Sequence, residues 1–369
     1  MTSRPPKGPS PRPGILEVAP YVGGESAIAG ATRVVKLSSN ENAFGPSPKA
    51  MEAFTRHAPD IHRYPDGRCE RLRRALAAAW NLDAERIVCG AGSDELIALL
   101  TRAYLGPGDA ALYSEHEFLM YSIATTSAGA RAIKVKETNL TANVDALLAA
   151  VTPSTKIVFL ANPNNPTGTY LPTAEVRRLR DRLPTNVLLI LDAAYAEFVT
   201  RPDYTSGAEL IEADGNAVML RTFSKIYGLG GLRLGWAYCP VAIADVLNRL
   251  RGPFNISSVA QVAGVAALND AAFVAKVRAH VETWREWTAA EARKLGLHVT
   301  PGIGNFVLIH FPPEPGRDAA AADAFLKSRG LIARRMERYG IGQALRVTIG
   351  REDEMRAFIV ALADFVKRG

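Results

Sequence analysis

The amino-acid sequence predicts an α/β protein, with a large domain built on a mostly parallel sheet sandwiched by helices and a smaller α+β domain. Three observations predict this fold. Strand-like and helix-like segments alternate between residues 86 and 238, which is the order that a parallel sheet with crossover helices requires. Several strand-like segments, such as 187–191, are apolar throughout, as is typical of strands covered on both faces. A helix-rich stretch at 241–295 then precedes two isolated apolar strands.

The predicted elements follow one another closely along the chain. A short strand is predicted at 34–37, before the alternating region. The strands predicted in that region, each a short apolar run, are 86–89, 110–113, 133–135, 157–160, 187–191, 217–221 and 234–238. The helices predicted between them are 95–104, 121–128 and 174–183; on the first, Leu96, Leu99, Leu100 and Ala103 share one face. Further along we predict strands at 305–311 and 345–349 and a closing helix at 352–366.

The length of 369 residues suits two domains of roughly 100–200 residues each. Residues 1–14 are rich in proline, and we expect a disordered tail there. We expect residues 15–44 to pack with the small domain. The large domain is predicted at 45–252 and the small domain at 253–369.

The composition is that of a globular protein, with 48% hydrophobic and 22% charged residues. The net charge of +7 fits an anionic small substrate. Basic residues are interleaved with acidic ones and lack neighbouring aromatic residues, so we expect no nucleic-acid partner. No apolar run approaches about 18 residues, so we expect no membrane span.

The three cysteines, Cys69, Cys89 and Cys239, are widely spaced and form no CxxC pair. They predict buried thiols in a reducing compartment, with neither a disulfide framework nor a metal site. The N-terminus has no apolar segment typical of a secretory signal. We therefore expect a cytoplasmic protein.

Lys225 lies in a loop of small residues between apolar segments. It follows the apolar stretch 217–220 and precedes the glycine-rich stretch 228–231. A lysine that is partly desolvated has a lowered pKa, and its neutral amine can attack a carbonyl carbon. For Lys225 taken alone, an exposed lysine on a glycine loop is the plainer interpretation. Four other segments favour the chemical role, because they supply the remaining parts of one site.

The segment 90–95 lies between a predicted strand and a predicted helix. Backbone N–H groups at a helix N-terminus can hold a phosphate where glycine lets the backbone approach. We expect this contact from the backbone at Gly92 and from the Ser93 hydroxyl. Asp94 suits the helix dipole but would repel a phosphate that it faced. An ordinary capped turn is the alternative interpretation.

Two polar segments directly follow predicted strands. The loop 162–168 holds Asn165 between prolines, at the strand end where open α/β sheets bind ligands. Asp192 follows the apolar strand 187–191, and a buried carboxylate needs a cation or hydrogen-bond donors. A protonated pyridine nitrogen is such a partner, and Tyr195 can reach a phenolate oxygen on the same ring. A ligand-free turn at 162–168 and a capping role for Asp192 stay open as alternatives.

Two further residues are candidates from their local pattern. Arg346 interrupts the apolar strand 345–349, and arginine in such a strand usually has a bidentate carboxylate partner, from the protein or from a substrate. Tyr64 lies directly before a proline turn. Taken alone, it is a loop tyrosine.

Together these segments resemble the aspartate-aminotransferase-type (fold type I) family of pyridoxal-phosphate enzymes, and within it the histidinol-phosphate aminotransferases. The matching motifs cover nearly the whole chain in the family's order and spacing. They are SNENAFGPSP, RYPDG, GAGSDELI, NPNNPTGTY, LDAAY, RTFSKIYGLGGLRLGW and LRVTIG. The resemblance implies a homodimer that binds pyridoxal 5′-phosphate and interconverts histidinol phosphate plus 2-oxoglutarate with imidazole-acetol phosphate plus glutamate, a step of histidine biosynthesis.

The resemblance also implies roles around the cofactor. Lys225 would form the internal aldimine and would shuttle a proton once substrate releases it. Asp192 would pair with the pyridinium nitrogen, and Asn165 and Tyr195 would hydrogen-bond the 3′ oxygen of the ring. The residues implied to hold the cofactor's phosphate are Gly92, Ser93, Thr222, Ser224 and Arg233, and Asp94 is implied as a further cofactor-binding residue.

Other implied roles concern the substrate and the second subunit. Tyr64 would reach the cofactor's phosphate from the neighbouring subunit, so the active sites of the homodimer would be shared. Arg346 would clamp the α-carboxylate of glutamate, and Tyr21, Asn42 and Asn165 would contact substrate.

The chain departs from the family's pattern in two places. LDAAY replaces the common sequence Asp-Glu-Ala-Tyr, which leaves Asp192 and Tyr195 in place. In the segment 115–118, Phe118 stands where relatives often carry a tyrosine stacked on the ring, so we expect Phe118 to stack there. Phenylalanine cannot donate a hydrogen bond, and this change is expected to alter substrate tuning.

Three other functions stay open. An aromatic amino-acid aminotransferase would differ only in the distal part of the substrate pocket. A decarboxylase acting on a phosphorylated amino acid would use the same lysine. A regulator that senses ligand through an aminotransferase-like domain would carry a DNA-binding domain, for which we expect no room in the proline-rich tail.

Overall fold

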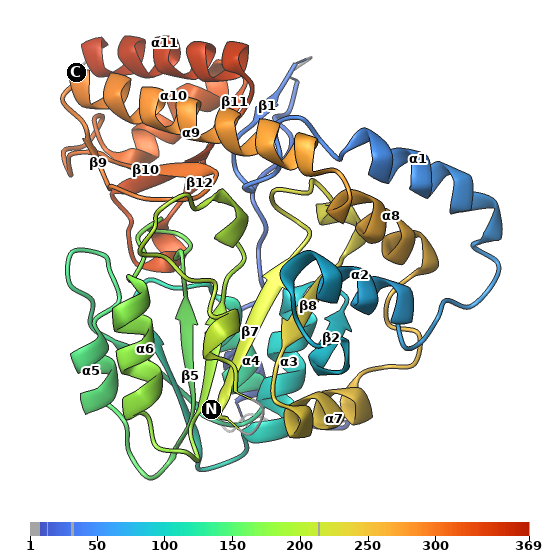
Figure 1. Cartoon of the computed structure of the whole chain (residues 1–369). Helices are drawn as coiled ribbons and strands as arrows, with labels where there is room; N and C mark the ends of the chain where they lie inside the picture. The colour runs from blue at the N-terminus through green and yellow to red at the C-terminus, as the bar shows by residue number, and fades with distance from the viewer. Residues whose placement is uncertain (1–7, 13, 31–32, 213–214, 369) are drawn as a thin grey trace.

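The computed structural model describes residues 8–12, 14–30, 33–212 and 215–368. A seven-stranded sheet forms the centre of the larger part of the molecule (Figure 1). In spatial order its strands are β2 (Ile87–Gly90), β8 (Gly235–Tyr238), β7 (Ala217–Thr222), β6 (Leu188–Asp192), β5 (Thr155–Ala161), β3 (Ala110–Ser114) and β4 (Arg131–Val135).

Most strands of this sheet run parallel to one another. The pairs β4–β3, β3–β5, β5–β6 and β6–β7 are parallel, whereas β8 is antiparallel to both β7 and β2. The predicted mostly parallel sheet is therefore confirmed. The ends of β5 and β6 lie side by side, with Ala161 opposite Asp192, and β7 ends beside them. Ligands of open α/β sheets bind at this edge.

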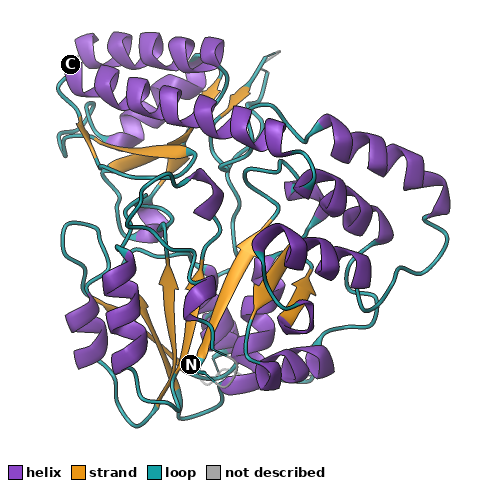
Figure 2. Cartoon of the chain, in the orientation of Figure 1, coloured by secondary structure: helices purple, strands orange, loops and turns teal. Residues whose placement is uncertain are grey.

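Helices cover both faces of the seven-stranded sheet (Figure 2). Successive side chains of a strand point to opposite faces, so Leu189 and Leu191 of β6 join one buried cluster while Leu188 and Ile190 join the other. Helices α2 (Glu70–Trp80), α6 (Thr173–Arg182) and α8 (Ser258–Leu268) contribute to the first cluster. Helices α3 (Ser93–Tyr104), α4 (Met120–Ser127) and α7 (Val241–Leu250) contribute to the second. Two more helices, α1 (Pro48–His57) and α5 (Val144–Ala149), pack on α8 and α6.

A second, antiparallel sheet has four strands in the order β12 (Arg334–Arg335), β13 (Ala344–Thr348), β10 (Phe306–His310) and β9 (His298–Val299). Its buried cluster includes residues of α9 (Ala271–Lys294), α10 (Ala319–Ser328) and α11 (Glu352–Arg368). The pair β1 (Val35–Lys36) and β11 (Leu331–Ile332) brings the N-terminal segment to this part, and Leu37 joins its core. Figure 1 shows this part at the upper left.

The predicted strands and helices all occur, with ends that shift by a few residues. Four helices, α1, α2, α5 and α10, fall in segments for which no helix is predicted above. Within the described ranges, short 3₁₀ helices occur at Ile15–Glu17, Ala58–Asp60, Ala84–Arg86, Ala196–Phe198, Ala208–Leu210, Gly230–Leu232 and Glu337–Tyr339.

Helix α9 passes from one core to the other. Its residues Val277 and Val281 pack in the first cluster of the seven-stranded sheet. Further along the same helix, Ala289 and Ala292 pack in the cluster of the four-stranded sheet. The domain boundaries at 44/45 and 252/253 remain predictions.

The proline-rich tail is described only in part, because residues 1–7 and 13 lie outside the described ranges. Arg12 donates a hydrogen bond of 2.6 Å to the carbonyl of Ser127, at the end of α4. The disorder expected for 1–14 remains a prediction.

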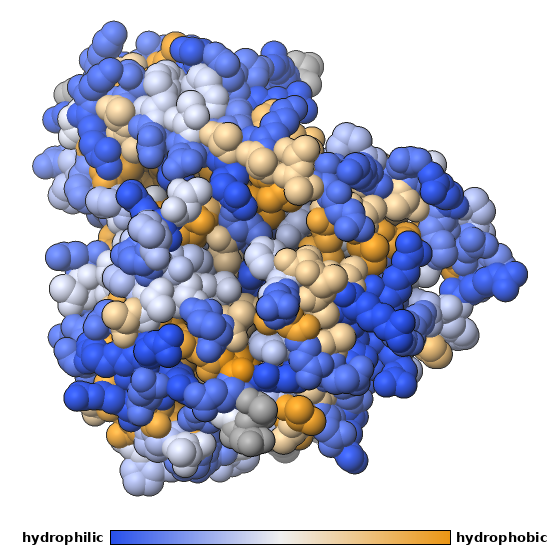
Figure 3. Space-filling view, in the orientation of Figure 1, coloured by the Kyte–Doolittle hydropathy of each residue, from blue (hydrophilic) through white to orange (hydrophobic). Residues whose placement is uncertain are grey.

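The three cysteines are free and buried, as predicted. The face drawn in Figure 3 is largely hydrophilic, with apolar residues interspersed. In the part of the chain that the structure describes, no single helix has the length and hydropathy to cross a bilayer. The helices α8 and α9 meet the length and hydropathy criteria only as a pair, and they are bent by 77° relative to each other. Among the same residues, no cluster of His, Cys, Asp and Glu could hold a metal ion.

Candidate active site

A cavity of about 460 Å³ opens at the carboxyl ends of β5, β6 and β7, between the two sheets. It brings together side chains from positions that are far apart in the sequence. The predicted site residues that line it are Tyr21, Ser93, Asp94, Phe118, Asn165, Asp192, Tyr195, Thr222, Ser224, Lys225, Arg233 and Arg346.

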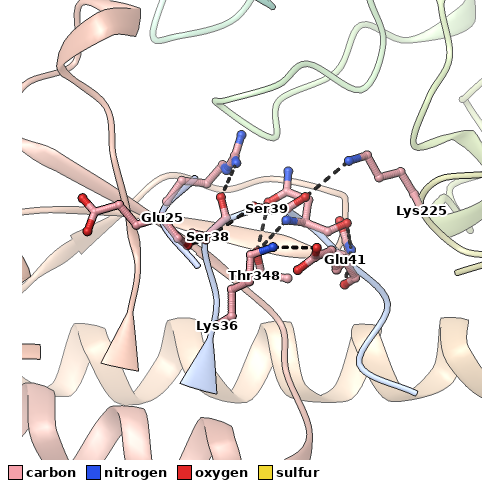
Figure 4. Close-up of polar contacts among 10 residues, drawn as sticks. Glu25, Lys36, Ser38, Ser39, Glu41, Lys225 and Thr348 are labelled. Carbon is pink, nitrogen blue, oxygen red and sulfur yellow. Dashed lines mark hydrogen bonds and ion pairs between the residues drawn. The ribbon is translucent and has the colours of Figure 1, made fainter. Parts of the chain in front are cut away.

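Lys225 follows β7 and extends its side chain into this cavity. Its Nζ lies 3.5 Å from the carbonyl oxygen of Ser39, toward which it points in Figure 4. It lies 5.8 Å from the centre of the Tyr195 ring. Burial, together with the nearby charge of Arg346, lowers the pKa of Lys225 to about 8, although Asp192 opposes this shift. A substantial fraction of the amine is therefore neutral near pH 8.

Asp192 is the last residue of β6, and its carboxylate is buried. Tyr121 donates a hydrogen bond of 2.8 Å to its Oδ2, and the N–H of Ala194 donates one of 3.2 Å to its Oδ1. Burial raises the pKa of Asp192 to about 6, although these two donors and Lys225 favour the charged form. Near neutral pH the site thus holds an anion that is only partly compensated, which suits a cationic ring nitrogen.

The N-terminus of α3 and the loop after β7 form the polar end of the cavity. Gly92 caps α3 at φ +88°, and a Cβ there would lie 2.2 Å from Nη2 of Arg233. The positive φ favours glycine at this position, and the absence of a side chain leaves space for the Arg233 guanidinium beside the helix end. The hydroxyl groups of Thr222 and Ser224 are 2.9 Å apart beside it. Helix N–H groups, hydroxyls and a guanidinium are suitable partners for a phosphate.

Asp94 partly offsets this positive charge. Its Oδ1 lies 2.5 Å from Nη2 of Arg233, and both side chains are nearly half exposed. The carboxylate is thus held by Arg233, at the first turn of α3.

Arg346 is a buried cation in the middle of β13, with 5% of its surface exposed. Its Nη1 donates to the side-chain oxygen of Asn165, and its Nη2 donates to the carbonyl of Ser38 at 3.0 Å. Its Nε has no hydrogen-bond partner among the described residues, and no described carboxylate lies within 4.0 Å. An uncompensated guanidinium in a cavity fits an anionic group of a small molecule.

Tyr195 is held by an asparagine that the sequence analysis does not single out. Asn40 donates a hydrogen bond of 2.8 Å from its side chain to the Tyr195 hydroxyl. The Tyr195 ring packs edge-on against Phe306, with 5.4 Å between ring centres. Burial raises the pKa of Tyr195, so its hydroxyl keeps a proton that it can donate.

Asn42, Tyr64 and Gly92 are predicted site residues that do not line the cavity. The side chain of Asn42 donates to the carbonyl of Ile226 at 2.7 Å and accepts the N–H of Phe44 at 2.9 Å, so it braces a turn. Tyr64 is 83% exposed and stacks on Phe254 with 4.8 Å between ring centres. Substrate contact by Asn42 and cofactor contact by Tyr64 remain predictions.

Several cavity residues escape the sequence analysis. Tyr121 stacks on Phe159, with 4.5 Å between ring centres, and also packs edge-on against Phe118. Arg334 lies directly opposite Arg346 across the β12–β13 pair, and it donates to the carbonyl of Val22 at 2.7 Å. The arginine pair at 334–335 in an otherwise apolar stretch is a signal that could have indicated Arg334. The other lining residues not predicted include Ser39, Asn40, Glu41 and Tyr339.

Comparisons with known proteins show which family this chain belongs to. The family model "Aminotransferase class I and II" matches residues 32–362. A histidinol-phosphate aminotransferase of Paramagnetospirillum magneticum is 59% identical over 97% of this chain and 99% of that protein. Another, from Rhodospirillum rubrum, is 57% identical over 97% of each chain.

Solved structures show the same fold. The histidinol-phosphate aminotransferase of Sinorhizobium meliloti, solved in complex with pyridoxal-5′-phosphate, superposes with a TM-score of 0.89 at 27% identity, over 98% of this chain and 99% of that one. An aspartate aminotransferase of Thermus thermophilus shares the fold, with a TM-score of 0.81 at 21% identity over 90% of this chain and 92% of that one. The chain belongs to the aminotransferase class I and II family.

Proposed function

We propose that this protein is a pyridoxal-phosphate-dependent aminotransferase that interconverts histidinol phosphate plus 2-oxoglutarate with imidazole-acetol phosphate plus glutamate. One observation carries the proposal. A buried lysine of lowered pKa, a buried aspartate and an uncompensated arginine line a single cavity. Relatives above 50% identity over nearly the whole chain are named for this activity, which supports the choice of substrate.

The residues present fit the cofactor. Gly92 provides close access to the N-terminus of α3, and Arg233 lies beside it, so this end suits the cofactor's phosphate. When bound, pyridoxal phosphate supplies an aldehyde carbon that reacts with amines and a ring that accepts the electron pair left at the substrate's α-carbon. Asp192 would hold a proton on the ring nitrogen, and Tyr121 and the N–H of Ala194 would keep Asp192 charged.

Lys225 supplies the amine and moves the proton. Because its pKa is lowered to about 8, its neutral form is populated at physiological pH and can accept a proton at Nζ. The same group, once protonated, can return that proton to a different carbon. The Tyr195 hydroxyl, fixed by Asn40, and the Asn165 side chain would hydrogen-bond the ring oxygen.

The two arginines on β12 and β13 would bind the anionic ends of the substrates. Arg334 and Arg346 are cross-strand neighbours and both line the cavity. Glutamate carries two carboxylates, and histidinol phosphate carries one phosphate but no carboxylate. We propose that Arg346 binds the α-carboxylate of glutamate, and that both arginines share the phosphate of histidinol phosphate. Tyr21, which also lines the cavity, would contact the bound substrate.

We also propose a cytoplasmic homodimer with shared active sites. The exposed side chains of Ile61, Tyr64 and Phe254 form apolar surface suited to a second copy of the chain. Tyr64 would then reach the neighbouring protomer's phosphate site. A mixture of Lys225→Ala and Tyr64→Ala subunits, each inactive or weak alone, would regain activity, because each dimer with one subunit of each kind would contain one complete site. No recovery on mixing would oppose this assignment.

The substrate is tested by steady-state kinetics of the purified holoenzyme with 2-oxoglutarate as acceptor. We expect kcat/KM for histidinol phosphate to exceed that for phenylalanine or tyrosine by about 100-fold or more, because only histidinol phosphate offers a phosphate to the two arginines. A preference for phenylalanine or tyrosine would assign the protein to the aromatic aminotransferases. Release of carbon dioxide from a phosphorylated amino acid would indicate a decarboxylase.

A further inference from the structure

The loop that carries Asn165 contacts the segment before β10 of the four-stranded sheet. The contact is between the two backbones, without intervening side chains. The N–H of Ile303 donates a hydrogen bond of 2.6 Å to the carbonyl of Gly168. A Cβ built on Gly302 would lie 2.9 Å from Cα of Gly168 and 3.0 Å from its carbonyl carbon and oxygen. These separations leave no room for a side chain, so the two backbones meet directly.

Hydrogen bonds within the loop hold its residues together, so we expect a displacement at Gly168 to move Asn165 as well. The N–H of Asn164 donates to the carbonyl of Thr169 at 2.8 Å, and the N–H of Gly168 donates back to Asn164 at 2.9 Å. The Thr167 hydroxyl accepts from the Asn164 side chain at 2.9 Å. Residues 164–169 therefore form one compact turn. Asn165 faces the cavity on one side of it, and Gly168 meets Gly302 on the other.

The four-stranded sheet thus contacts the turn at two points. Arg346 on β13 donates to the Asn165 side chain. Ile303 precedes β10, in which Leu308 pairs with Arg346. Arg285 of α9 holds the approach to β10 by donating to the carbonyl of Gly304 at 3.2 Å. The segment 302–304 is therefore fixed to the same body that carries Arg346.

We propose that Gly302 and Ile303 are positioning residues for Asn165, because their contact with Gly168 makes the 164–169 turn follow the four-stranded sheet. When an anionic substrate binds Arg346, any shift of that sheet is transmitted to Asn165 and to its hydrogen bond with the cofactor ring. This inference rests on the proposed function for its cofactor readout. The backbone contact itself does not depend on it.

The test compares Gly302→Ala with Gly342→Ala. The added methyl group at 302 collides with the backbone of Gly168, whereas a Cβ at Gly342 meets only the Glu337 side chain at 3.7 Å. Hydrogen exchange of the segment 163–170 is followed by mass spectrometry, in the protein with and without pyridoxal phosphate. In Gly302→Ala we expect exchange there to be about fivefold faster or more, with no change in Gly342→Ala.

The second readout is the pH midpoint of the bound cofactor's visible absorbance, with and without 2-oxoglutarate. We expect Gly302→Ala to shift the midpoint by about 0.5 unit or more and to weaken its response to 2-oxoglutarate, because Asn165 no longer holds the ring oxygen. A merely structural contact would lower stability in denaturation and leave this midpoint unchanged. Unchanged exchange and an unchanged midpoint in folded Gly302→Ala would overturn the proposal.

A milder variant keeps the proposal testable if Gly302→Ala does not fold. Arg285→Gln removes the contact with Gly304 without adding bulk at Gly168, and we expect the same two changes to a smaller extent. No change in either readout for Arg285→Gln would then count against the proposal. If the wild-type protein binds no cofactor, the proposed function fails, while hydrogen exchange of the cofactor-free variants still decides whether the contact positions the turn.

Discussion

The hydroxyl of Tyr121 donates a hydrogen bond of 2.8 Å to the Asp192 carboxylate while its ring stacks on Phe159, with 5° between the ring planes. A phenol is thus fixed by packing, and its hydroxyl points at the buried Asp192 carboxylate that lines the cavity. Since the hydrogen bond favours the charged form of Asp192, Tyr121 supports the pairing of Asp192 with a protonated ring.

Replacing Tyr121 by Phe tests this relationship. The ring and its stacking remain, but the pKa of Asp192 rises above its value of about 6. As the pH falls, the carboxylate is therefore protonated at a higher pH than in the wild type. We expect kcat to fall about tenfold, as for loss of one hydrogen bond to a charged group, and the acid limb of the pH–rate profile to move to higher pH. Tyr113→Phe, a buried neighbour that does not line the cavity, is the control. An acid limb at the same pH in both variants would contradict the role.

The buried charge of Asp192 should weaken the protein when no cofactor is bound. Burial raises its pKa from 3.8 to about 6 in the folded state, so the folded protein binds the proton more tightly than the unfolded chain. Its contribution to the free energy of unfolding is therefore lost as the pH rises through about 6. At pH 8 the raised pKa of Asp192 corresponds to a loss of about 3 kcal/mol in the free energy of unfolding.

Urea denaturation of the cofactor-free protein measures this effect. We expect Asp192→Asn to be more stable than the wild type by about 1–2 kcal/mol at pH 8, because part of the gain is offset by an unpaired amide. The sign should reverse near pH 4, where Asp192 is protonated in the folded wild type. The wild type has then regained about 3 kcal/mol, so Asp192→Asn should be the less stable protein by about 1–2 kcal/mol. A variant that is less stable than the wild type at pH 8 would show that the charged Asp192 does not destabilise the cofactor-free protein.

Arg346→Gln is expected to raise KM for glutamate about 100-fold, because the substrate carboxylate loses its buried cation. The kcat should fall less, since Lys225 and Asp192 remain in place. Arg335→Gln is a matched control, because Arg335 adjoins Arg334 on β12 but does not line the cavity. Equal KM values in Arg346→Gln and the wild type would remove Arg346 from the substrate site.

Arg334→Gln is expected to separate the two substrates. A phosphate dianion should depend on both arginines of the β12–β13 pair, whereas the α-carboxylate of glutamate is assigned to Arg346 alone. We expect KM for histidinol phosphate to rise about 10-fold or more, with a smaller change for glutamate. If both KM values change by the same factor, Arg334 does not distinguish phosphate from carboxylate.

The fold was accessible from the sequence mainly where strands are buried on both faces. The strand β6 (Leu188–Asp192) could be predicted because all of its residues before Asp192 are apolar. The helix α5 could not, because its six residues are too few to show a clear helical period. In α10, the alanine-rich segment gives little contrast between a buried and an exposed face.

The site was predictable where a residue lies at the end of a strand or shortly after it, as for Asp192 at the end of β6 and Lys225 in the loop after β7. Two asparagines show where this reasoning stops. Asn40 and Asn42 lie in the same polar segment, and only Asn40 faces the cavity. The backbone at Asn40 has φ +54°, and this turn, together with a hydrogen bond to Thr348 on β13, decides which side chain points inward. Tyr121 is similar, because its partner Asp192 lies 71 residues away in sequence.

The covalent attachment of the cofactor to Lys225 is the central claim, and reduction of the holoenzyme with borohydride followed by peptide mass spectrometry tests it most directly. The account predicts a phosphopyridoxyl group on Lys225, within the tryptic peptide 222–233, and on no other lysine in appreciable yield. Cleavage after Lys225 should be lost in the same sample, because the modified side chain no longer fits trypsin. An unmodified Lys225, or a modification mainly on another lysine, would contradict the account.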